Sequence, residues 1–303
     1  MIKRYINFLG LEETIKLLDA NELPLKQSIR VNTLKIHPEE LKKRLDKKGF
    51  ELETLEWISY GFKILKEAIN LGSLHEYLQG YFYIQNIVSM LPAIILDPQP
   101  DNIVIDMCAA PGGKATHLAQ LMNNQGSLIL IERNRKRIPA LEMNLRRMGV
   151  INSIVLNFDA QDLYKLDVKA DKILLDAPCT GEGLVREDPT RKRSKTLADI
   201  NKMAKMQIKL LDAGLKALKP GGELLYSTCS IAPEENELVL HHTLQNNSDY
   251  SIIKMKEDYG VNGYINVFGL TLREDIKLSQ RFFPHLHDTI GFFICLIRRN
   301  PKI

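Results

Sequence analysis

The sequence predicts an α/β protein built around a Rossmann-like, doubly wound sheet with a ligand site at one edge. Three consecutive patterns predict this fold class. Ile103–Ile105 is a short apolar, β-branched run, which is typical of a strand buried on both faces. The turn Ala109–Gly113 follows, and a helical pattern with Leu118, Leu121 and Met122 comes next. A strand, a glycine turn and a helix form the first unit of such a sheet, which binds its ligand at the carboxyl ends of the strands.

The glycine turn narrows the class of ligand. Its small residues allow a ligand to approach the backbone closely. The glycines do not follow the Gly-x-Gly-x-x-Gly spacing of dinucleotide sites, and the chain has no Walker Gly-Lys-Ser/Thr sequence. The turn therefore indicates a nucleotide-like ligand other than a nicotinamide dinucleotide or a nucleoside triphosphate. A tight turn that binds no ligand is the alternative interpretation.

Composition sets further limits on the class of protein. The chain of 303 residues is 45% hydrophobic, enough for one large domain or two unequal ones. Its net charge of +4 permits nucleic-acid binding without requiring it. No apolar run reaches membrane-spanning length, and the start, Met1–Tyr5, lacks the apolar segment of a signal peptide. We therefore expect a cytoplasmic protein that does not bind a membrane.

The cysteines indicate neither disulfides nor a metal site. Cys108, Cys179, Cys229 and Cys295 lie far apart and do not have zinc-ligand spacing. In a cytoplasmic chain this pattern predicts free thiols. We interpret Cys108 and Cys295 as small buried hydrophobic residues, and we expect no metal.

The elements before the glycine turn predict a small module of their own. Short helices are expected over residues 1–22, and a strand over residues 29–34. Pro38 opens a helix that runs to Gly49, and a second strand covers residues 50–55. Such a module either handles substrate or only packs against its neighbour, and the pattern leaves both alternatives open.

The rest of the chain alternates between strands and helices. We assign residues 1–78 to an amino-terminal α+β module and residues 79–303 to the sheet domain. Strands are expected at 103–105, 127–131, 153–158, 173–175, 223–226 and 291–297, and helices at 135–148, 197–218 and 233–244. Strands that alternate with helices predict a parallel sheet.

Acidic residues follow four of these strands. Asp106, Glu132, Asp159 and Asp176 each lie just past the carboxyl end of a strand, which is the ligand-binding edge. Glu132 comes about twenty residues after the glycines, the usual offset for a carboxylate that binds ribose hydroxyls. Asp159 is placed to accept an adenine amino group. A solvated loop or a helix cap explains any one of these acids, but four in register favour adenosine with a small charged tail, and S-adenosylmethionine fits this description.

Two cysteines indicate the chemistry. Cys179 and Cys229 follow strands at the ligand-binding edge and have polar, glycine-containing or hydroxyl-bearing neighbours. Carbon 5 of a pyrimidine becomes nucleophilic only after a thiolate adds to carbon 6. A methyl donor beside thiols therefore predicts pyrimidine methylation. The attacking thiol needs a pKa that differs from the usual value of about 8.5.

The motifs around these residues resemble those of a known family. Asp106–Lys114, Asp176–Gly183 and Ser227–Ser230 are similar to the signature motifs of the Sun/nucleolar-protein family of RNA 5-methylcytosine methyltransferases. Further segments that resemble the family are Ser28–Leu34, Tyr83–Pro92, Arg281–His285 and Gly291–Cys295. The resemblance covers nearly the whole chain and is strongest to the short archaeal tRNA enzymes. It implies an S-adenosylmethionine-dependent methyltransferase fold with an RNA-recognition-like amino-terminal module.

The resemblance also implies roles for individual residues. Cys229 would be the nucleophile, and Cys179 would help to release the methylated product. Asp176 would contact the cytosine, with Lys114 near the base and the cofactor. Residues implied to contact S-adenosylmethionine are Cys108, Ala109, Ala110, Pro111, Gly112, Gly113, Lys114, Glu132, Arg137, Asp159 and Asp176. Ala115 and Asn86 depart from the family pattern, and neither affects the two cysteines.

The expected partner is RNA, most of all tRNA, and a monomer is favoured. Two basic clusters are candidates for phosphate contacts, although a solvated surface explains them equally well. Their members are Arg133, Arg135, Lys136 and Arg137, and Arg186, Arg191, Lys192, Arg193 and Lys195. Alternatives to a tRNA methyltransferase are an rRNA cytosine-5 methyltransferase, a DNA cytosine methyltransferase, and a non-catalytic RNA-binding factor with the same fold.

Overall fold

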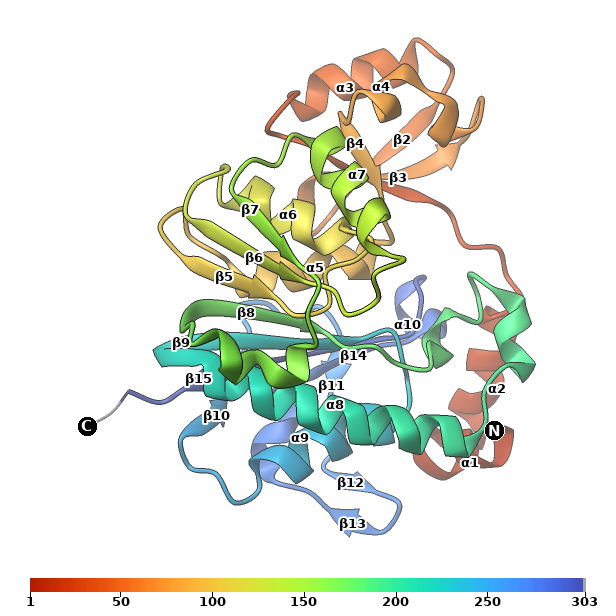
Figure 1. The fold of residues 1–303 in the computed structure, drawn as a ribbon. Coiled ribbons are helices and arrows are strands. Elements are labelled where there is room, and N and C mark those ends of the chain that lie inside the picture. Colours follow the sequence, from red (N-terminus) through yellow and green to blue (C-terminus); the bar gives the residue numbers. More distant parts are fainter. Residues whose placement is uncertain (302–303) are drawn as a thin grey trace. The chain divides into compact units, whose positions relative to one another are not determined.

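The computed structural model describes residues 1–301, which divide into two compact units (Figure 1). The glycine-turn unit is Lys26–Phe158, and the cysteine unit consists of Met1–Leu25 together with the residues from Asp159 onward. These two units are defined by compactness and do not correspond to the predicted domains 1–78 and 79–303. The domain boundary after residue 78 stays a prediction. Residues 302 and 303, at the end of the predicted second domain, lie outside the described residues.

The glycine-turn unit begins with a four-stranded antiparallel sheet, ordered β2-β3-β1-β4. Its strands are β1 (Ser28–Val31), β2 (Glu51–Leu55), β3 (Ile58–Lys66) and β4 (Phe82–Ile84), and its helices are α3 (Pro38–Asp46) and α4 (His75–Leu78). The core of this sheet is formed by Ile29 and Phe82 from the sheet, by Leu41 and Leu45 from α3, and by Phe50. The helix predicted from Pro38 is α3, and the strands predicted over 29–34 and 50–55 are β1 and β2, so all three are confirmed. β3 and β4 were not predicted.

A parallel sheet follows in the same unit. Its strands are β5 (Ile103–Asp106), β6 (Ser127–Ile131) and β7 (Ser153–Leu156), and the helices are α5 (Ile87–Leu96), α6 (Gly113–Leu121) and α7 (Ile138–Met148). β5 pairs with β6 and β6 with β7, all parallel. Asp106 is in register with Leu130, and Ile131 with Leu156. The ends of these strands therefore lie at one edge, which places Asp106 and Glu132 there.

The cysteine unit contains a mixed sheet. Its strands are β8 (Ala170–Asp176), β9 (Leu218–Thr228), β10 (Tyr250–Ile252), β11 (Val261–Asn262), β14 (Gln280–Phe282) and β15 (Phe292–Arg299). β8 and β9 are parallel, but β15 lies antiparallel to β9. β10 and β14 also pair antiparallel with β15. The expectation of a purely parallel sheet is wrong here, because the apolar pattern of 291–297 identifies a buried strand without giving its direction.

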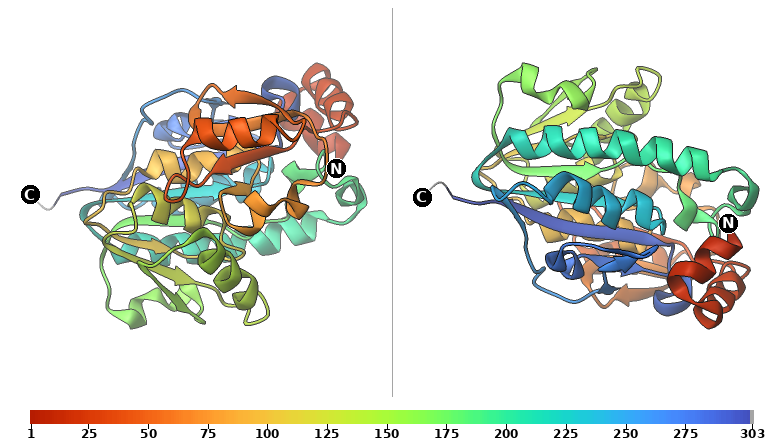
Figure 2. Two further views of the ribbon diagram at one scale, coloured as in Figure 1. Left: turned by 90° about the horizontal axis from the view of Figure 1, so that it is seen from above. Right: turned by 90° about the horizontal axis from the view of Figure 1, so that it is seen from below.

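Helices cover one face of this mixed sheet. α8 (Leu197–Ala217) lies against β8 and β9, and α9 (Glu237–Leu244) lies beside it (Figure 2). α8 begins with a capping box, in which Thr196 and Asp199 satisfy each other's backbone N–H groups. Residues 219–222, which separate the expected helix 197–218 from the expected strand 223–226, lie inside β9, where the register with β8 shifts.

The remaining elements of the cysteine unit are short. α1 (Ile2–Leu9) and α2 (Leu11–Ala20) form a helical pair, and α2 packs against α10 (Pro284–His287). A small hairpin joins β12 (Asn266–Val267) to β13 (Leu270–Thr271), and the 3₁₀ segments are η2 (Ala160–Leu166), η3 (Glu182–Leu184), η4 (Pro189–Arg193), η5 (Pro233–Glu235) and η6 (Glu274–Leu278). Within residues 1–301, no helix is long and apolar enough to cross a bilayer.

Candidate active site

The glycine turn is folded tightly between β5 and α6. Asp106 Oδ1 accepts the N–H of Cys108 at 3.2 Å, and the N–H of Ala109 donates to the carbonyl of Ile131 at 2.9 Å. Gly112, the residue before α6, has φ 108°, a left-handed conformation that glycine adopts without strain. A Cβ at Gly112 would also lie 3.1 Å from Leu141 Cδ1 of α7. The glycine is therefore required both by the backbone and by its close packing.

Side chains of the same unit hold the carbonyl groups of this turn. Arg137 donates to the Ala110 carbonyl, and Asn144 Nδ2 donates to that of Pro111 at 2.9 Å. The buried Arg30 donates to the Gly113 carbonyl at 2.7 Å. The turn is thus fixed at the start of α6, where the first backbone N–H groups of a helix have no partner inside the helix. Such a helix start favours a negatively charged group of a ligand.

Glu132 lies at the same edge, directly after β6. Its side chain is almost fully buried, with 5% of the residue exposed. Oε1 accepts the N–H of Asn134 at 2.7 Å, and Oε2 forms an ion pair with Arg137 Nη1 at 3.2 Å. Arg137 therefore links the carboxylate to the glycine turn. A carboxylate accepts about four hydrogen bonds, so Glu132 retains capacity for further donors.

The structure brings the predicted site residues together in two groups. Cys108–Gly113, Lys114, Glu132 and Arg137 belong to the glycine-turn unit, with Lys114 half-buried in the first turn of α6. Asp159, Asp176, Cys179 and Cys229 belong to the cysteine unit. Asp159 begins η2 and accepts the N–H of Gln161 at 3.0 Å. The catalytic and cofactor-binding roles of all these residues stay predictions.

The two thiols that carry the chemical hypothesis lie in direct contact. Cys179 Sγ and Cys229 Sγ are 3.1 Å apart, and both residues are partly exposed. The segments that carry them are joined by further bonds. Ser227 Oγ donates to Asp176 Oδ1 at 2.9 Å, and the N–H of Gly183 donates to the Cys229 carbonyl at 3.0 Å. Residues far apart in the sequence thus form one site.

The contact affects the ionisation of Cys179. The pKa of the Cys179 thiol is raised well above its usual value, first by its hydrogen bond to Cys229, then by burial and by the negative charges of Cys229 and Glu235. Cys179 therefore keeps its proton at neutral pH. In that state it is a hydrogen-bond donor to the sulfur of Cys229.

Gly183 is essential to the close approach of these segments. A Cβ there would lie 2.1 Å from the Gly291 carbonyl oxygen and 2.8 Å from that of Cys229. We expect Gly183→Ala to lower the free energy of unfolding by about 3 kcal/mol, because backbone has to shift to make room. Urea denaturation measures this change.

Gly221→Ala is the matched control for Gly183→Ala. A Cβ at Gly221 meets no atom within 4 Å, so only its left-handed backbone, φ 79°, opposes the change. The expected cost is about 1–2 kcal/mol. Equal effects of the two substitutions would mean that the close contact at Gly183 does not limit stability.

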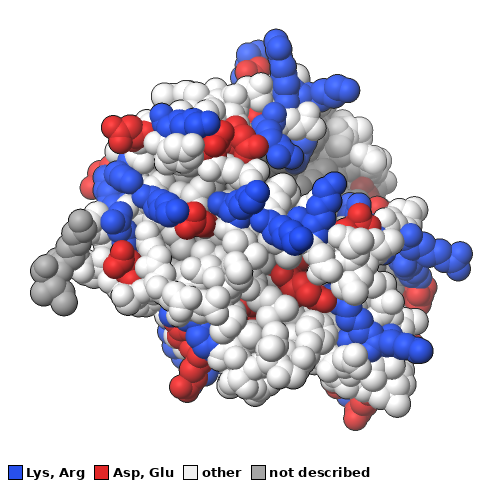
Figure 3. All heavy atoms as spheres, turned by 60° about the horizontal axis from the view of Figure 1, so that its bottom comes forward, with Lys and Arg blue, Asp and Glu red and all other residues white. Residues whose placement is uncertain are grey.

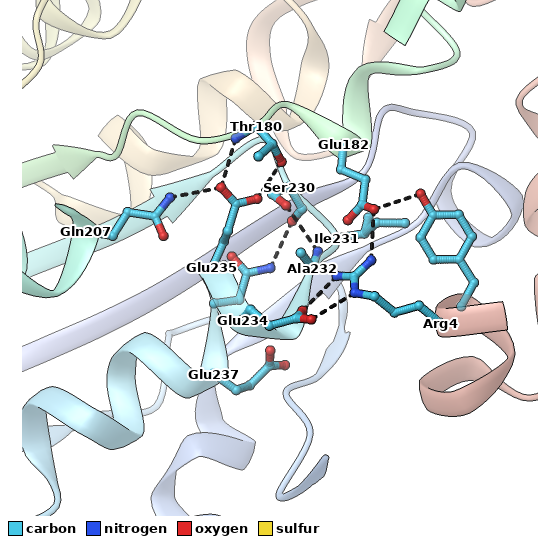
Figure 4. Close-up of polar contacts among 12 residues, drawn as sticks. Arg4, Thr180, Glu182, Gln207, Ser230, Ile231, Ala232, Glu234, Glu235 and Glu237 are labelled. Atoms are coloured by element: carbon cyan, nitrogen blue, oxygen red, sulfur yellow. Dashed lines mark hydrogen bonds and ion pairs between the residues drawn. The ribbon is translucent and has the colours of Figure 1, made fainter. Parts of the chain in front are cut away.

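Two adjacent residues that the sequence analysis missed, Glu235 and Asn236, hold both cysteine segments in place, and Figure 4 shows Glu235 with Thr180 and Gln207. Glu235 is fully buried and accepts hydrogen bonds from the N–H of Thr180 at 2.8 Å, from Thr180 Oγ1 at 2.6 Å and from Gln207 Nε2 at 3.3 Å. Gln207 Nε2 also donates to the carbonyl of Pro178 at 2.9 Å. The residue before Cys179 and the residue after it are both bonded to this small network.

Asn236 does the same for Cys229. Its Oδ1 accepts from Thr228 Oγ1 at 2.6 Å, and its Nδ2 donates to the Ser230 carbonyl at 2.9 Å. The sequence signal is the Pro-Glu-Glu-Asn stretch shortly after Ser230, which by its pattern alone predicts only the start of a helix. Acidic and amide side chains immediately behind a reactive loop could have identified these positions.

The members of the basic cluster after Cys179 differ in burial and in partners. Arg186 is buried and donates to the carbonyls of Leu23 and Pro24 and to Asp288. Arg191 pairs with Asp188, and Lys192 with Glu22. Arg193 and Lys195 are exposed. Only part of the cluster therefore presents its charge to solvent.

The two remaining cysteines differ in their burial. Cys295 is fully buried in β15, and burial raises the pKa of its thiol, as expected of a core residue. Cys108 is half-buried, so its interpretation as a buried hydrophobic residue is wrong: it lies in the turn rather than beneath it. Among residues 1–301, no group of three or more His, Cys, Asp and Glu side chains is arranged to hold a metal ion.

Comparisons with known proteins identify relatives along the whole chain. The family model of 16S rRNA methyltransferase RsmB/F matches residues 93–298, and that of the N-terminal domain of 16S rRNA methyltransferase RsmF matches residues 1–87. The chain is 35% identical to a 28S rRNA (cytosine-C(5))-methyltransferase of Mus musculus, over 99% of this chain and 38% of that protein.

Solved structures of Pyrococcus horikoshii proteins are also similar. A methyltransferase homolog protein has a TM-score of 0.89 and 43% identity, over 98% of this chain and 93% of that one. NSun6 with SFG has a TM-score of 0.87 and 29% identity, over 99% and 98%.

These matches test the fold and the family. The chain spans between 37% and 60% of the length of the curated relatives that it matches. The predicted α/β methyltransferase fold with a small amino-terminal domain is confirmed. Since the RsmB/F model matches more than half of the chain, the chain belongs to the 16S rRNA methyltransferase RsmB/F family, the Sun/nucleolar-protein family that its motifs predicted.

Proposed function

We propose that this protein is an S-adenosylmethionine-dependent RNA cytosine-5 methyltransferase that works through a covalent bond between Cys229 and the target cytosine. The observation that carries the proposal is the 3.1 Å contact between the Cys179 and Cys229 sulfurs. One thiol is needed to attack the ring, and a second beside it assists the same sulfur. The membership of the RsmB/F family supports the proposal.

Cys229 acts first, as the nucleophile. Its thiolate adds to carbon 6 of cytosine, and the electrons of the 5,6 double bond move to carbon 5. Carbon 5 would then take the electrophilic methyl group that bound S-adenosylmethionine supplies, and the sulfur of the cofactor would keep the electrons of the broken bond. A base removes the proton from carbon 5, the double bond re-forms, and the sulfur–carbon bond breaks with its electrons returning to Cys229. Asp176 accepts a hydrogen bond from Ser227, which precedes Cys229 by two residues in the sequence. We propose that Asp176 contacts the cytosine.

Cys179 assists the thiolate of Cys229 from its protonated state. The raised pKa keeps the Cys179 proton in place, and the short sulfur–sulfur distance directs that S–H to Cys229. A hydrogen bond to an ionised acceptor is stronger than one to a neutral acceptor. Cys179 therefore stabilises Cys229 as it leaves the methylated ring, which is the role that the family resemblance implies.

The glycine-turn unit has the groups that S-adenosylmethionine requires. The cofactor, when bound, supplies an electrophilic methyl group. The fixed turn and the start of α6 suit its methionine carboxylate, and the buried Glu132 suits the ribose hydroxyls. Arg137 links the glycine turn to Glu132, since it contacts both Glu132 and the Ala110 carbonyl. Asp159 is proposed to bind the adenine amino group.

A row of lysines on α8 favours RNA as the substrate. Lys202, Lys205 and Lys209 are exposed and lie on one helix face, since they are three and four residues apart. No ion pair involves them among the described residues. Figure 3 shows a row of Lys and Arg side chains on the face that carries this helix. We propose that phosphate groups of the RNA bind there.

Replacing these lysines is expected to weaken RNA binding and its dependence on salt. In the Lys202→Gln/Lys205→Gln/Lys209→Gln variant, the slope of log K against log salt concentration should fall by about 2, because each single-strand phosphate contact contributes about 0.7. Fluorescence anisotropy at several salt concentrations measures the slope. Lys216→Gln is the control, since Lys216 lies on the same helix but is paired with Asp212. An unchanged slope in the triple variant would show that these three lysines do not bind RNA phosphates.

The class of RNA is the finer part of the proposal. We propose tRNA, on the resemblance to short archaeal tRNA enzymes, with ribosomal RNA as the second candidate because curated relatives are named for it. Purified protein is incubated with methyl-labelled S-adenosylmethionine and, separately, with tRNA, ribosomal RNA and duplex DNA. Label in 5-methylcytosine of tRNA is the expected result. Label in ribosomal RNA alone would select the second candidate, and binding without any transfer would contradict an enzymatic role.

A further inference from the structure

We propose that a cavity beside the Cys179 segment binds the base of the nucleotide next to the target cytidine, and that it selects a base with an exocyclic amino group. The inference rests on the proposed function and adds a sequence preference to it. The cavity lies entirely within the cysteine unit and has a volume of about 340 Å³. This size falls within the range of small-molecule sites, about 300–1,000 Å³.

The walls of the cavity come from two parts of the chain. Tyr5 and Leu18 contribute from α1 and α2, and Thr180, Glu182 and Val185 contribute from the segment after Cys179. Tyrosine, leucine and valine supply apolar surface that suits the faces of a base. Because Thr180 directly follows Cys179, a nucleobase here would be close to the one that Cys179 and Cys229 act on.

Two residues of the cavity have buried oxygens without partners. Glu182 Oε1 accepts from Arg4 Nη1 and from the hydroxyl of Tyr5, both at 2.9 Å (Figure 4). Glu182 Oε2 has no hydrogen-bond partner, and neither has Asn21 Oδ1. Glu182 is only 8% exposed. Buried polar atoms in folded proteins nearly always have partners, so these two acceptors indicate a ligand that donates hydrogen bonds.

Chemistry of this kind distinguishes among the bases. Adenine, cytosine and guanine each carry an exocyclic amino group, which donates hydrogen bonds to a carboxylate. Uracil has carbonyl oxygens in place of that group, and the only donor on its pairing edge is the ring N–H between them, so a uracil with an oxygen toward Glu182 leaves Glu182 Oε2 unpaired. A site built to bond a donor rejects an analogue that lacks it much more strongly than an apolar pocket rejects a small change in size.

Basic residues at the cavity indicate that the ligand carries a phosphate. Arg191, Lys192 and Lys195 belong to the lining. Arg191 and Lys192 are paired with Asp188 and Glu22, and Lys195 is exposed. The backbone of an RNA chain entering the cavity would therefore meet Lys195. A nucleotide within a polymer fits this combination of an apolar wall, two acceptors and a cation.

The test uses an RNA pool in which every position around cytidines is randomised. The full chain methylates the pool with S-adenosylmethionine, an antibody to 5-methylcytosine selects the methylated molecules, and sequencing without bisulfite reads the bases that flank the cytidine. We expect uridine to be depleted at least tenfold at one flanking position. Glu182→Gln replaces an acceptor by an amide that can donate, so this variant should lose the depletion or favour uridine at the same position.

Glu234→Gln is the matched control. Glu234 also pairs with Arg4, at 2.7 Å, but does not line the cavity. Thermal unfolding of each variant shows whether it is folded, and Asn21→Ala serves as the second variant if Glu182→Gln is not. Methylation without any flanking preference in the wild type, or an unchanged preference in both Glu182→Gln and Asn21→Ala, would overturn the inference. Absence of 5-methylcytosine in every RNA would instead overturn the proposed function.

Discussion

Cys229→Ala is expected to abolish methyl transfer, with a loss of about 10⁴-fold or more, because the variant has no nucleophile for carbon 6. Label transfer from S-adenosylmethionine to RNA measures this loss. RNA binding and the thermal unfolding temperature should stay close to those of the wild type, since the Cys229 side chain is small and partly exposed.

Cys295→Ala is the matched control for the nucleophile. Cys295 is also in the cysteine unit but is buried in β15, away from solvent. It should lose stability, by about 1 kcal/mol, and keep its activity once folded. Comparable transfer by Cys229→Ala and the wild type would rule out covalent catalysis by this thiol.

Glu235→Ala is the second change with a large expected effect. It removes the acceptor for the Thr180 N–H, the Thr180 hydroxyl and the Gln207 amide in a fully buried setting. Each buried donor left unpaired costs about 1–3 kcal/mol. We therefore expect the free energy of unfolding to fall by about 3 kcal/mol or more, as measured by urea denaturation.

Glu235→Gln tests whether this residue also affects the chemistry. It preserves the shape of the side chain but removes the negative charge that contributes to the raised pKa of Cys179. Loss of that charge lowers the pKa of Cys179, so its thiolate should form at lower pH than before. The pH dependence of Cys179 alkylation, measured in a Cys229→Ala background, reports this shift. An alkylation profile identical with and without Glu235→Gln would restrict Glu235 to a structural role.

A double-mutant cycle separates the loop contact from the rest of the network. Thr180→Ala removes the hydrogen bond from the Thr180 hydroxyl to Glu235 and leaves the bond from Gln207 to Glu235 in place. The coupling between Thr180→Ala and Glu235→Gln should be between about 0.5 and 3 kcal/mol, since residues in one buried hydrogen-bond network are not additive.

Much of the ligand-binding edge could be predicted because it follows from local patterns. Ser127–Ile131 was expected as a strand and is β6 with the same limits. An apolar run that ends in an acid specifies both a buried strand and the polar residue at its carboxyl end. Asp106 and Glu132 therefore lie at the expected edge. The two thiols, each predicted to follow a strand at the ligand-binding edge, are in contact.

Other features could not be predicted because they depend on contacts between distant segments. β3 contains Gly61 and Lys63 among its apolar residues, and only its pairing with β1 and β2 makes it a central strand. The direction of β15 is set by its pairing with β9 and β14. Periodicity records which residues are buried, and not which strand lies beside them.

The polar network showed the same limit more clearly. Glu235 and Arg186 both look like surface charges in the sequence, yet both are buried. Glu235 accepts hydrogen bonds from Thr180 and Gln207, and Arg186 donates to carbonyls near Pro24 and to Asp288. A charged residue is buried when partners from elsewhere in the chain pair with it, and a single sequence does not reveal those partners.

The most direct test of the account is a denaturing gel of Cys179→Ala with RNA and S-adenosylmethionine. If Cys229 attacks and Cys179 assists its departure, this variant forms the sulfur–carbon bond but resolves it slowly. A band of protein joined to RNA should accumulate, and mass spectrometry of the digested band should place the RNA on Cys229. No such band should form with Cys229→Ala. A band in Cys229→Ala and none in Cys179→Ala would contradict the account, because it would make Cys179 the nucleophile.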